Sequence, residues 1–202
     1  MAVVTTTIDL IRHGEPVGGK KYRGQIDDPL SDKGWQQMRS AVGDHCPWDQ
    51  IVSSSLSRCA AFAHELAQRH GLPVELDSRL TEIGFGVWEG KTAQEIMAED
   101  EQALLNFWQD PIGYRPEGAE ALTDFEQRVV AGFEHLLLSH QGKHVLAVGH
   151  AGMMRMILRY VLDMPLDAMF KLDVPNAGIS RIKVDHHADG RMMRLCFHAG
   201  SL

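Results

Sequence analysis

The chain has 202 residues, of which 44% are hydrophobic and 23% are charged, and its formal net charge is −7. This length and composition are typical of a globular protein with a sizeable core, so we expect a single domain over residues 1–202. The net negative charge disfavours nucleic acid and an anionic membrane surface as partners. An anionic ligand would therefore need a local cluster of positive side chains.

The three cysteines, Cys46, Cys59 and Cys196, are far apart in the sequence and form no C-x-x-C pair. This pattern is typical of a reducing compartment and indicates neither a disulfide framework nor a zinc site. The first residues contain no recognisable signal peptide and no stretch long enough to span a membrane, so we expect a cytoplasmic protein.

Strand patterns alternate with helix patterns along most of the chain. Apolar runs predict strands at 6–12, 50–54, 73–76 and 144–150, and two strands joined by a hairpin loop within 178–199. Helices are predicted at 35–42 after a cap at Ser31, at 56–70, from the capping box Thr92–Glu95 onward, at 122–139 and at 153–162. This order predicts an α/β fold, a three-layer α/β/α sandwich on a mostly parallel sheet. We expect residues 77–142 to form a helical insertion over the C-terminal strand edge, and the hairpin to add an antiparallel edge.

The stretch Gly14–Lys20 spells G-x-x-x-x-G-K and offers one functional alternative, a nucleotide-binding phosphate loop. Such a loop needs a Ser or Thr after the Lys to hold Mg²⁺, but Lys21 follows here. Pro16 also removes one backbone N–H from the loop, and no helical pattern opens at Lys20. These departures disfavour a nucleotide site.

A second interpretation rests on two histidines, His13 and His150, that each follow a predicted buried strand. Ligands of parallel sheets bind beyond the carboxyl ends of the strands, so both side chains can face one pocket. Arg12 lies beside His13, and Arg58 opens the helix after the second strand. Guanidinium groups bind phosphate in bidentate geometry, so this edge of the sheet can hold a phosphoryl group. Glu82, in a glycine-rich loop, is the candidate acid that would protonate a leaving alkoxide.

Four stretches, LIRHGE (10–15), SSSLSRC (53–59), LTEIGFGVWEG (80–90) and VGHAG (148–152), resemble the motifs of the histidine phosphatase superfamily, the phosphoglycerate-mutase-like group. The resemblance implies that His13 is the nucleophile that becomes phosphohistidine, and that Glu82 is the acid and then the base. It implies that Arg12, Arg58 and His150 hold the phosphoryl oxygens. We expect His150 to be protonated as a donor, because the adjacent phosphoryl dianion would raise its pKa. No metal and no cofactor are implied. His13 must be neutral on its attacking nitrogen, which favours a hydrogen bond from the other ring nitrogen to a backbone carbonyl.

The sequence also departs from the family pattern. Pro16 and Gly19 replace a Thr and an Asn that are frequent in the family, and that Asn contacts phosphate. The stretch YRGQIDDPLSDKGWQQM (22–38) is closer to the bacterial α-ribazole-5′-phosphate phosphatases of cobalamin assembly. This resemblance makes a metal-independent phosphomonoester hydrolase the first hypothesis.

The alternatives are a phosphoglycerate mutase, a phosphatase for another small phosphorylated metabolite and a non-catalytic module that binds phosphorylated ligands. Arg23 is a predicted substrate contact, and Arg115 is another polar candidate. Phe85, Trp88, Trp108 and Tyr114 could form an apolar wall, although packing of a core or lid is the simpler role for the tryptophans. The sequence indicates no oligomeric state.

Overall fold

The computed structural model describes residues 3–200 and 202, and its centre is a six-stranded sheet in the order β3-β2-β4-β1-β5-β6. The strands are β1 Val4–Arg12, β2 Gln50–Ser53, β3 Val74–Leu76, β4 His144–Gly149, β5 Ile179–His187 and β6 Gly190–Gly200. The first four strands in chain order pair in parallel, whereas β5 and β6 pair antiparallel at one edge. The predicted mostly parallel sheet with a terminal antiparallel hairpin is confirmed.

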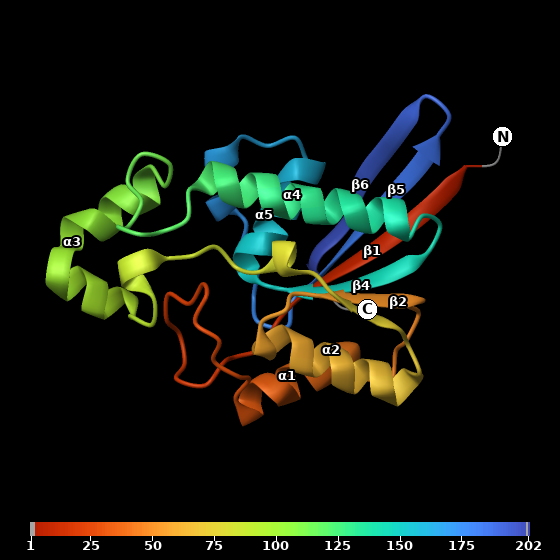
Figure 1. Ribbon diagram of the computed structural model, residues 1–202, viewed down its shortest axis with the longest axis horizontal. Helices are drawn as coiled ribbons and strands as arrows, with labels where there is room; N and C mark the ends of the chain where they lie inside the picture. The colour runs from red at the N-terminus through yellow and green to blue at the C-terminus, as the bar shows by residue number, and fades with distance from the viewer. Residues whose placement is uncertain (1–2, 201) are drawn as a thin grey trace.

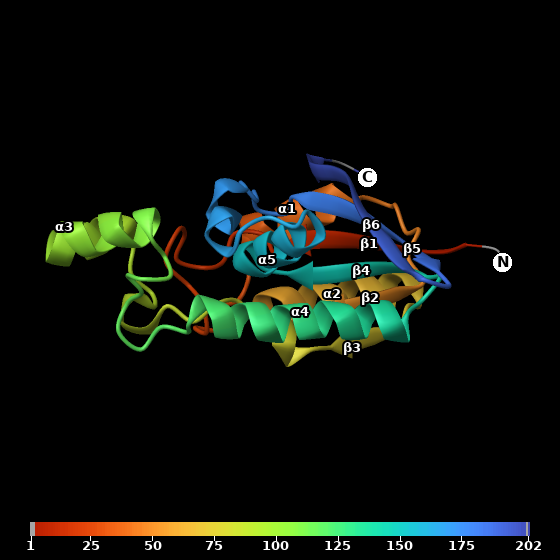
Figure 2. The same ribbon diagram turned by 90° about the horizontal axis from the view of Figure 1, so that it is seen from above.

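Helices cover both faces of this sheet (Figures 1 and 2). The α-helices are α1 Asp32–Val42, α2 Ser57–His70, α3 Ala93–Gln109, α4 Leu122–Ser139 and α5 Ala151–Val161, and short 3₁₀ helices are η1 Ser78–Leu80, η2 Gly86–Trp88 and η3 Leu166–Lys171. Figure 1 shows α1 and α2 on one side of the sheet and α4 and α5 on the other. The structure therefore confirms the predicted three-layer α/β/α sandwich.

The central strand β4 shows why both faces need cover. Val145 and Ala147 point into the core formed with α4 and α5, whereas Leu146 and Val148 point into the core formed with α1 and α2. Alternate residues of a strand face opposite sides of a sheet, so a continuous apolar run is buried only between two helical layers.

The segment between residues 77 and 142 has two parts. Helix α4 packs along the sheet and contributes to the main core, whereas α3 projects beyond the carboxyl ends of the strands (Figure 1). A small aromatic cluster that includes Trp88 and Phe107 joins α3 to the rest of the protein. The predicted capping box is present, because the Thr92 hydroxyl accepts the Glu95 N–H and the Glu95 carboxylate accepts the Thr92 N–H.

Three parallel strands bring their ends to one place. Arg12 of β1 lies opposite Gly149 of β4, and Ser53 of β2 lies opposite Val148 of β4. The residues that follow these strands therefore gather at one edge of the sheet. No helix in the described part of the chain is long and apolar enough to cross a bilayer.

Candidate active site

His13 follows β1 and is almost completely buried, with 6% of its surface exposed. Its Nδ1 lies 2.7 Å from the backbone carbonyl oxygen of Gly14, the hydrogen bond expected from the sequence. Burial, followed by the charges of Arg12 and Arg58, lowers the pKa of His13 to about 3. The imidazole is therefore neutral, and because Nδ1–H donates to a carbonyl, Nε2 keeps its lone pair for attack.

His150 follows β4 and occupies the N-cap position of α5, where it is fully buried. Its ring lies edge-on to that of His13, with 5.2 Å between the ring centroids. Burial first, then the charges of Arg58 and His13, lowers the pKa of His150 well below its usual range. We expected a protonated His150, but without a bound anion the structure favours a neutral ring.

Arg12 and Arg58 are held by backbone carbonyls. Arg12 donates to the carbonyl oxygen of Val174 at 2.7 Å, and the fully buried Arg58 donates to those of Ile26 and Gly24 at 2.8 and 2.9 Å. The Nε atoms of both arginines are buried and have no hydrogen-bond partner in the structure. Buried donors are normally satisfied, so these two indicate a site that an anion completes.

Glu82 lies in the loop after η1 with 7% of its surface exposed. Its carboxylate accepts the N–H of Ile83 and the N–H of Gly152, each at 3.0 Å. The second contact places the carboxylate beside the first turn of α5, two residues after His150. The structure thus brings five predicted residues to one edge of the sheet: Arg12, His13, Arg58, Glu82 and His150.

One family model covers the whole segment that contains these five residues. The model of the histidine phosphatase superfamily (branch 1) matches residues 8–195. The chain belongs to the histidine phosphatase superfamily.

Curated members of this superfamily share about a third of their residues with the chain. A bifunctional protein of Mycobacterium tuberculosis is 32% identical over 190 residues, which cover 92% of this chain and 51% of that protein. The chain therefore spans about half the length of this relative. A candidate phosphoglycerate mutase of Salmonella arizonae is 33% identical over 181 residues, which cover 86% of this chain and 82% of that protein.

Solved structures in the superfamily match nearly the whole chain. A mycobacterial glucosyl-3-phosphoglycerate phosphatase gives a TM-score of 0.85 at 28% identity, covering 98% of this chain and 100% of that one. A candidate α-ribazole-5′-phosphate phosphatase of Escherichia coli gives a TM-score of 0.79 at 26% identity, and the match covers 94% of this chain and 95% of that one.

Within this histidine phosphatase, Glu89 holds the site together in a way that the sequence analysis missed. Its carboxylate accepts the backbone N–H groups of Gly24, Gln25 and Ile26 at 3.0–3.1 Å and that of Phe85 at 2.8 Å. The same loop provides the carbonyls that orient Arg58. The sequence shows only a single glutamate in a glycine-rich loop. No neighbouring residue indicates which backbone groups its carboxylate binds.

A second support lies behind Glu82. Arg128 of α4 donates to the backbone carbonyl oxygens of Thr81 and Glu82, both at 2.8 Å, and forms an ion pair with Glu120. Gln25 also donates to the Glu82 carbonyl at 2.7 Å. These contacts fix the loop that carries the candidate acid, and their partners are 57 and 46 positions away along the chain.

Arg23, the predicted substrate contact, is buried and engaged within its own loop. Its guanidinium donates to Asp28 at 2.7 Å and to the carbonyl oxygens of Val17 and Gly19 at 2.9 and 3.0 Å. It lies near enough to His13 to contribute to the lowering of that residue's pKa. These contacts show that Arg23 holds together the loop of residues 17–28.

The stretch Gly14–Lys20 does not form a nucleotide-binding loop. Pro16 forms an isolated bridge with Leu30, and the chain after Lys20 is irregular up to α1, with no helix N-terminus for a phosphate. Among the described residues, no three His, Cys, Asp or Glu side chains are grouped to hold a metal ion.

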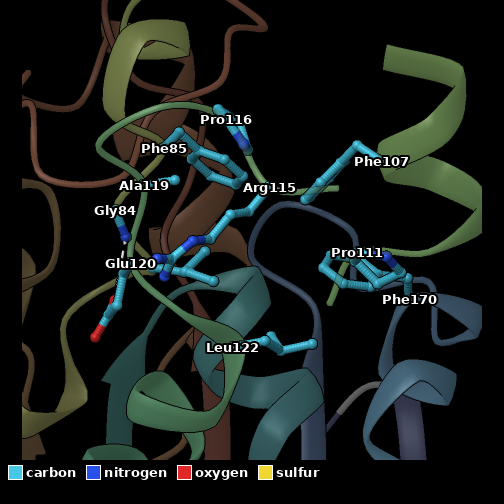
Figure 3. A pocket seen from close by; sticks show the side chains of 11 residues that line it. Gly84, Phe85, Phe107, Pro111, Arg115, Pro116, Ala119, Glu120, Leu122 and Phe170 are labelled. Atoms are coloured by element: carbon cyan, nitrogen blue, oxygen red, sulfur yellow. Dashed lines mark hydrogen bonds between the residues drawn. The ribbon is translucent and has the colours of Figure 1, made fainter. Parts of the chain in front are cut away.

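A small pocket next to the Glu82 loop is lined by residues 83–85, by the segment before α4 and by Phe107 and Phe170 (Figure 3). The space within it is small, about 10 Å³, which is room for a single water molecule. Its lining is mostly apolar and includes Phe85, Phe107 and Phe170, and Figure 3 shows the Arg115 side chain reaching into it between Phe85 and Leu122. Of the expected aromatic wall, Phe85 lines this pocket, whereas Trp88 and Tyr114 line a separate groove against α3.

Proposed function

We propose that the protein hydrolyses small phosphomonoesters through a covalent phosphohistidine on Nε2 of His13. One observation carries this proposal: a neutral histidine, with Nδ1 engaged, lies among arginines whose buried Nε atoms have no partner. A neutral imidazole supplies the nucleophile, and the arginine N–H groups supply fixed donors for the charge on the phosphoryl oxygens.

The proposed reaction has two steps. In the first, Nε2 of His13 attacks phosphorus, the ester P–O bond breaks, and the leaving oxygen takes the proton of Glu82. In the second, a water gives a proton to the Glu82 carboxylate while its oxygen attacks phosphorus. The P–N bond then breaks and inorganic phosphate leaves. Positioning and electrostatic stabilisation by Arg12 and Arg58 supply most of the catalysis.

As the substrate we propose α-ribazole-5′-phosphate, which would place the enzyme in cobalamin assembly. The similarity to the Escherichia coli candidate phosphatase and the resemblance in residues 22–38 support this choice. The three free cysteines support a reducing compartment, and we propose the cytoplasm.

A phosphate-release screen with α-ribazole-5′-phosphate, sugar phosphates and phosphoglycerates tests the proposal. We expect turnover that survives a chelator, acid-labile phosphate on the protein, and loss of both turnover and label in His13→Ala. An exposed-histidine variant, His64→Ala, is the matched control and keeps the wild-type rate. Undiminished turnover by His13→Ala would exclude the phosphohistidine route.

Phosphoglycerate mutase activity is the second candidate, because a Salmonella relative described in this way is 33% identical to the chain. A mutase would convert one phosphoglycerate into another and would depend on a bisphosphate primer. Release of inorganic phosphate without isomerisation would exclude it. Binding of phosphate esters with no turnover across the whole screen would instead support a non-catalytic module.

A further inference from the structure

Ser54 lies directly behind His150. It follows β2, is fully buried, and its Oγ is 2.7 Å from Nε2 of His150. The sulfur of Cys59 is a weaker and more distant partner of the ring, at 3.6 Å from Nε2 and 3.9 Å from Nδ1. Ser54 therefore makes the shortest hydrogen bond to this ring among the described residues.

The other contacts of Ser54 favour one direction for this hydrogen bond. Its Oγ already accepts the backbone N–H of Leu56, at 3.3 Å. The Cys59 thiol donates to the carbonyl oxygen of Gly149, at 3.4 Å, so its proton is directed elsewhere. Two acceptors lie near the Ser54 proton, the weakly accepting sulfur of Cys59 and the Nε2 lone pair of His150, and the nitrogen is the stronger of the two. A neutral imidazole that accepts at Nε2 carries its proton on Nδ1.

The charges around His150 favour the neutral ring. Arg12 and His13 face it from the end of β1, Arg58 and Cys59 from α2, and Arg128 from α4. Three of these five groups are permanently positive. One carboxylate, that of Glu82, also lies beside this end of α5, where it accepts the N–H of Gly152. The ring is also completely buried, so an imidazolium there would be both desolvated and repelled.

We propose that Ser54 is a positioning residue that holds His150 as the neutral tautomer protonated on Nδ1, so that an uncharged ring donates to a phosphoryl oxygen. This inference rests on the proposed phosphatase function for its role in catalysis. A neutral imidazole can act as an electrophilic donor when its second nitrogen is satisfied. The arginines then supply the positive charge that stabilises the phosphoryl group, and His150 supplies a hydrogen bond that fixes the orientation of one phosphoryl oxygen.

Nitrogen NMR of histidine-labelled protein tests the tautomer directly. His150→Gln identifies the signals of this ring by their loss. With saturating inorganic phosphate near neutral pH, we expect the wild-type ring to show a protonated Nδ1 and an unprotonated Nε2. An imidazolium, or a proton on Nε2 alone, would overturn the proposal without the need for any Ser54 variant.

Binding of inorganic phosphate, measured by calorimetry, supplies the second test. Ser54→Ala should weaken it about tenfold, the effect of one lost hydrogen bond, and Ser54→Thr should restore it to within about threefold. Ser53→Ala is the matched control, because Ser53 is equally buried but its hydroxyl donates to the Ser54 carbonyl. Equal binding by the Ser54→Ala and Ser53→Ala variants would contradict the inference.

The two proposals fail separately. If the wild type shows the expected tautomer and binds phosphate but hydrolyses no monoester, only the proposed function fails. If the wild type turns over monoesters through His13 while the ring shows another protonation state, only the role of Ser54 fails.

Discussion

The Glu82 carboxylate accepts the backbone N–H of Gly152, and this contact fixes the candidate acid relative to His150. The approach leaves no room for a side chain at residue 152. A Cβ there would lie 2.2 Å from Oε1 of Glu82 and 3.4 Å from the Phe125 ring. Glycine is therefore needed at position 152 because the Glu82 carboxylate packs against it, and not because the conformation of α5 demands it.

Gly152→Ala should reduce kcat about 100-fold, because a displacement of the acid by about 1 Å costs on this order. The Glu82 side chain can swing away, so we expect the free energy of unfolding to change by less than about 1 kcal/mol. Steady-state kinetics and thermal unfolding measure the two effects. Ala151→Gly is the control, because it alters the same helical turn without crowding Glu82. A Gly152→Ala enzyme with normal kcat would show that Glu82 is not the acid.

Glu89→Gln should weaken substrate binding by loosening the loop that holds Arg58. The carboxylate accepts four backbone N–H groups, and an amide places an NH₂ group against some of them. Hydrogen bonds to a charged group contribute about 1.5–3 kcal/mol each, so we expect KM to rise about tenfold and stability to fall by about 2 kcal/mol.

Glu99→Gln is the control for this change. Glu99 pairs with Lys91 at the surface of α3, and its side chain is 61% exposed, so neither KM nor the free energy of unfolding should change. If both variants behaved alike, the loop would not depend on Glu89.

The residues that the sequence could place are those whose position follows from the strand pattern alone. His13 and His150 each follow an apolar run, and parallel strands bring such residues to one edge. Glu89 and Arg128 were missed because their partners are backbone groups of distant loops. The role of Asp9 is equally hidden: it is buried, and Arg181 of β5, His144 of β4 and Trp48 of the loop before β2 hydrogen-bond to it. Hydrogen bonds across such separations leave no local pattern.

Stability should fall as the pH is lowered from about 6.5 to about 3, and His13 should contribute to this fall. Its pKa is about 3 in the folded protein against an ordinary 6.5, so within this window the unfolded chain binds a proton that the folded chain does not. One such group adds a slope of up to about 1.4 kcal/mol per pH unit. Asp9 acts in the same direction at lower pH. Although burial alone would raise its pKa, hydrogen bonds from Arg181, His144 and Trp48 lower it to about 2.

Urea unfolding of His13→Asn at several pH values tests this expectation. Between pH 6 and pH 4 the free energy of unfolding of the variant should fall less steeply than that of the wild type. The difference between the two slopes should be on the order of that of one titrating group, up to about 1.4 kcal/mol per pH unit. The exposed-residue variant His64→Asn should follow the wild type. Parallel curves for His13→Asn and the wild type would contradict the low pKa of His13.

Gly19→Asn should be accepted by the fold and should lower KM for the phosphorylated substrate. Gly19 has φ +73°, and no atom lies within 4 Å of a Cβ built there. Asn enters this left-handed region more readily than most residues, so the stability cost should stay below about 1 kcal/mol. Gly19→Ala is the control, since it has the same backbone restraint without the amide. If KM stayed unchanged in Gly19→Asn, an amide at this position would not reach the phosphoryl group in this protein.

Arg115 should decide how the enzyme treats a charged leaving group. Glu120, in the same pocket, pairs with Arg128, whereas in the described part of the chain no carboxylate pairs with Arg115. Arg115 lines this pocket but is exposed, so its unpaired guanidinium can bind a carboxylate, whereas it gains only about 0.5–1 kcal/mol from a neutral ring. Arg115→Ala should therefore lower kcat/KM about tenfold for 3-phosphoglycerate and less than about fivefold for α-ribazole-5′-phosphate. Arg115→Lys keeps the charge and should keep most of the activity on 3-phosphoglycerate. An equal loss on both substrates would mean that Arg115 supports the shape of the pocket instead of sensing charge.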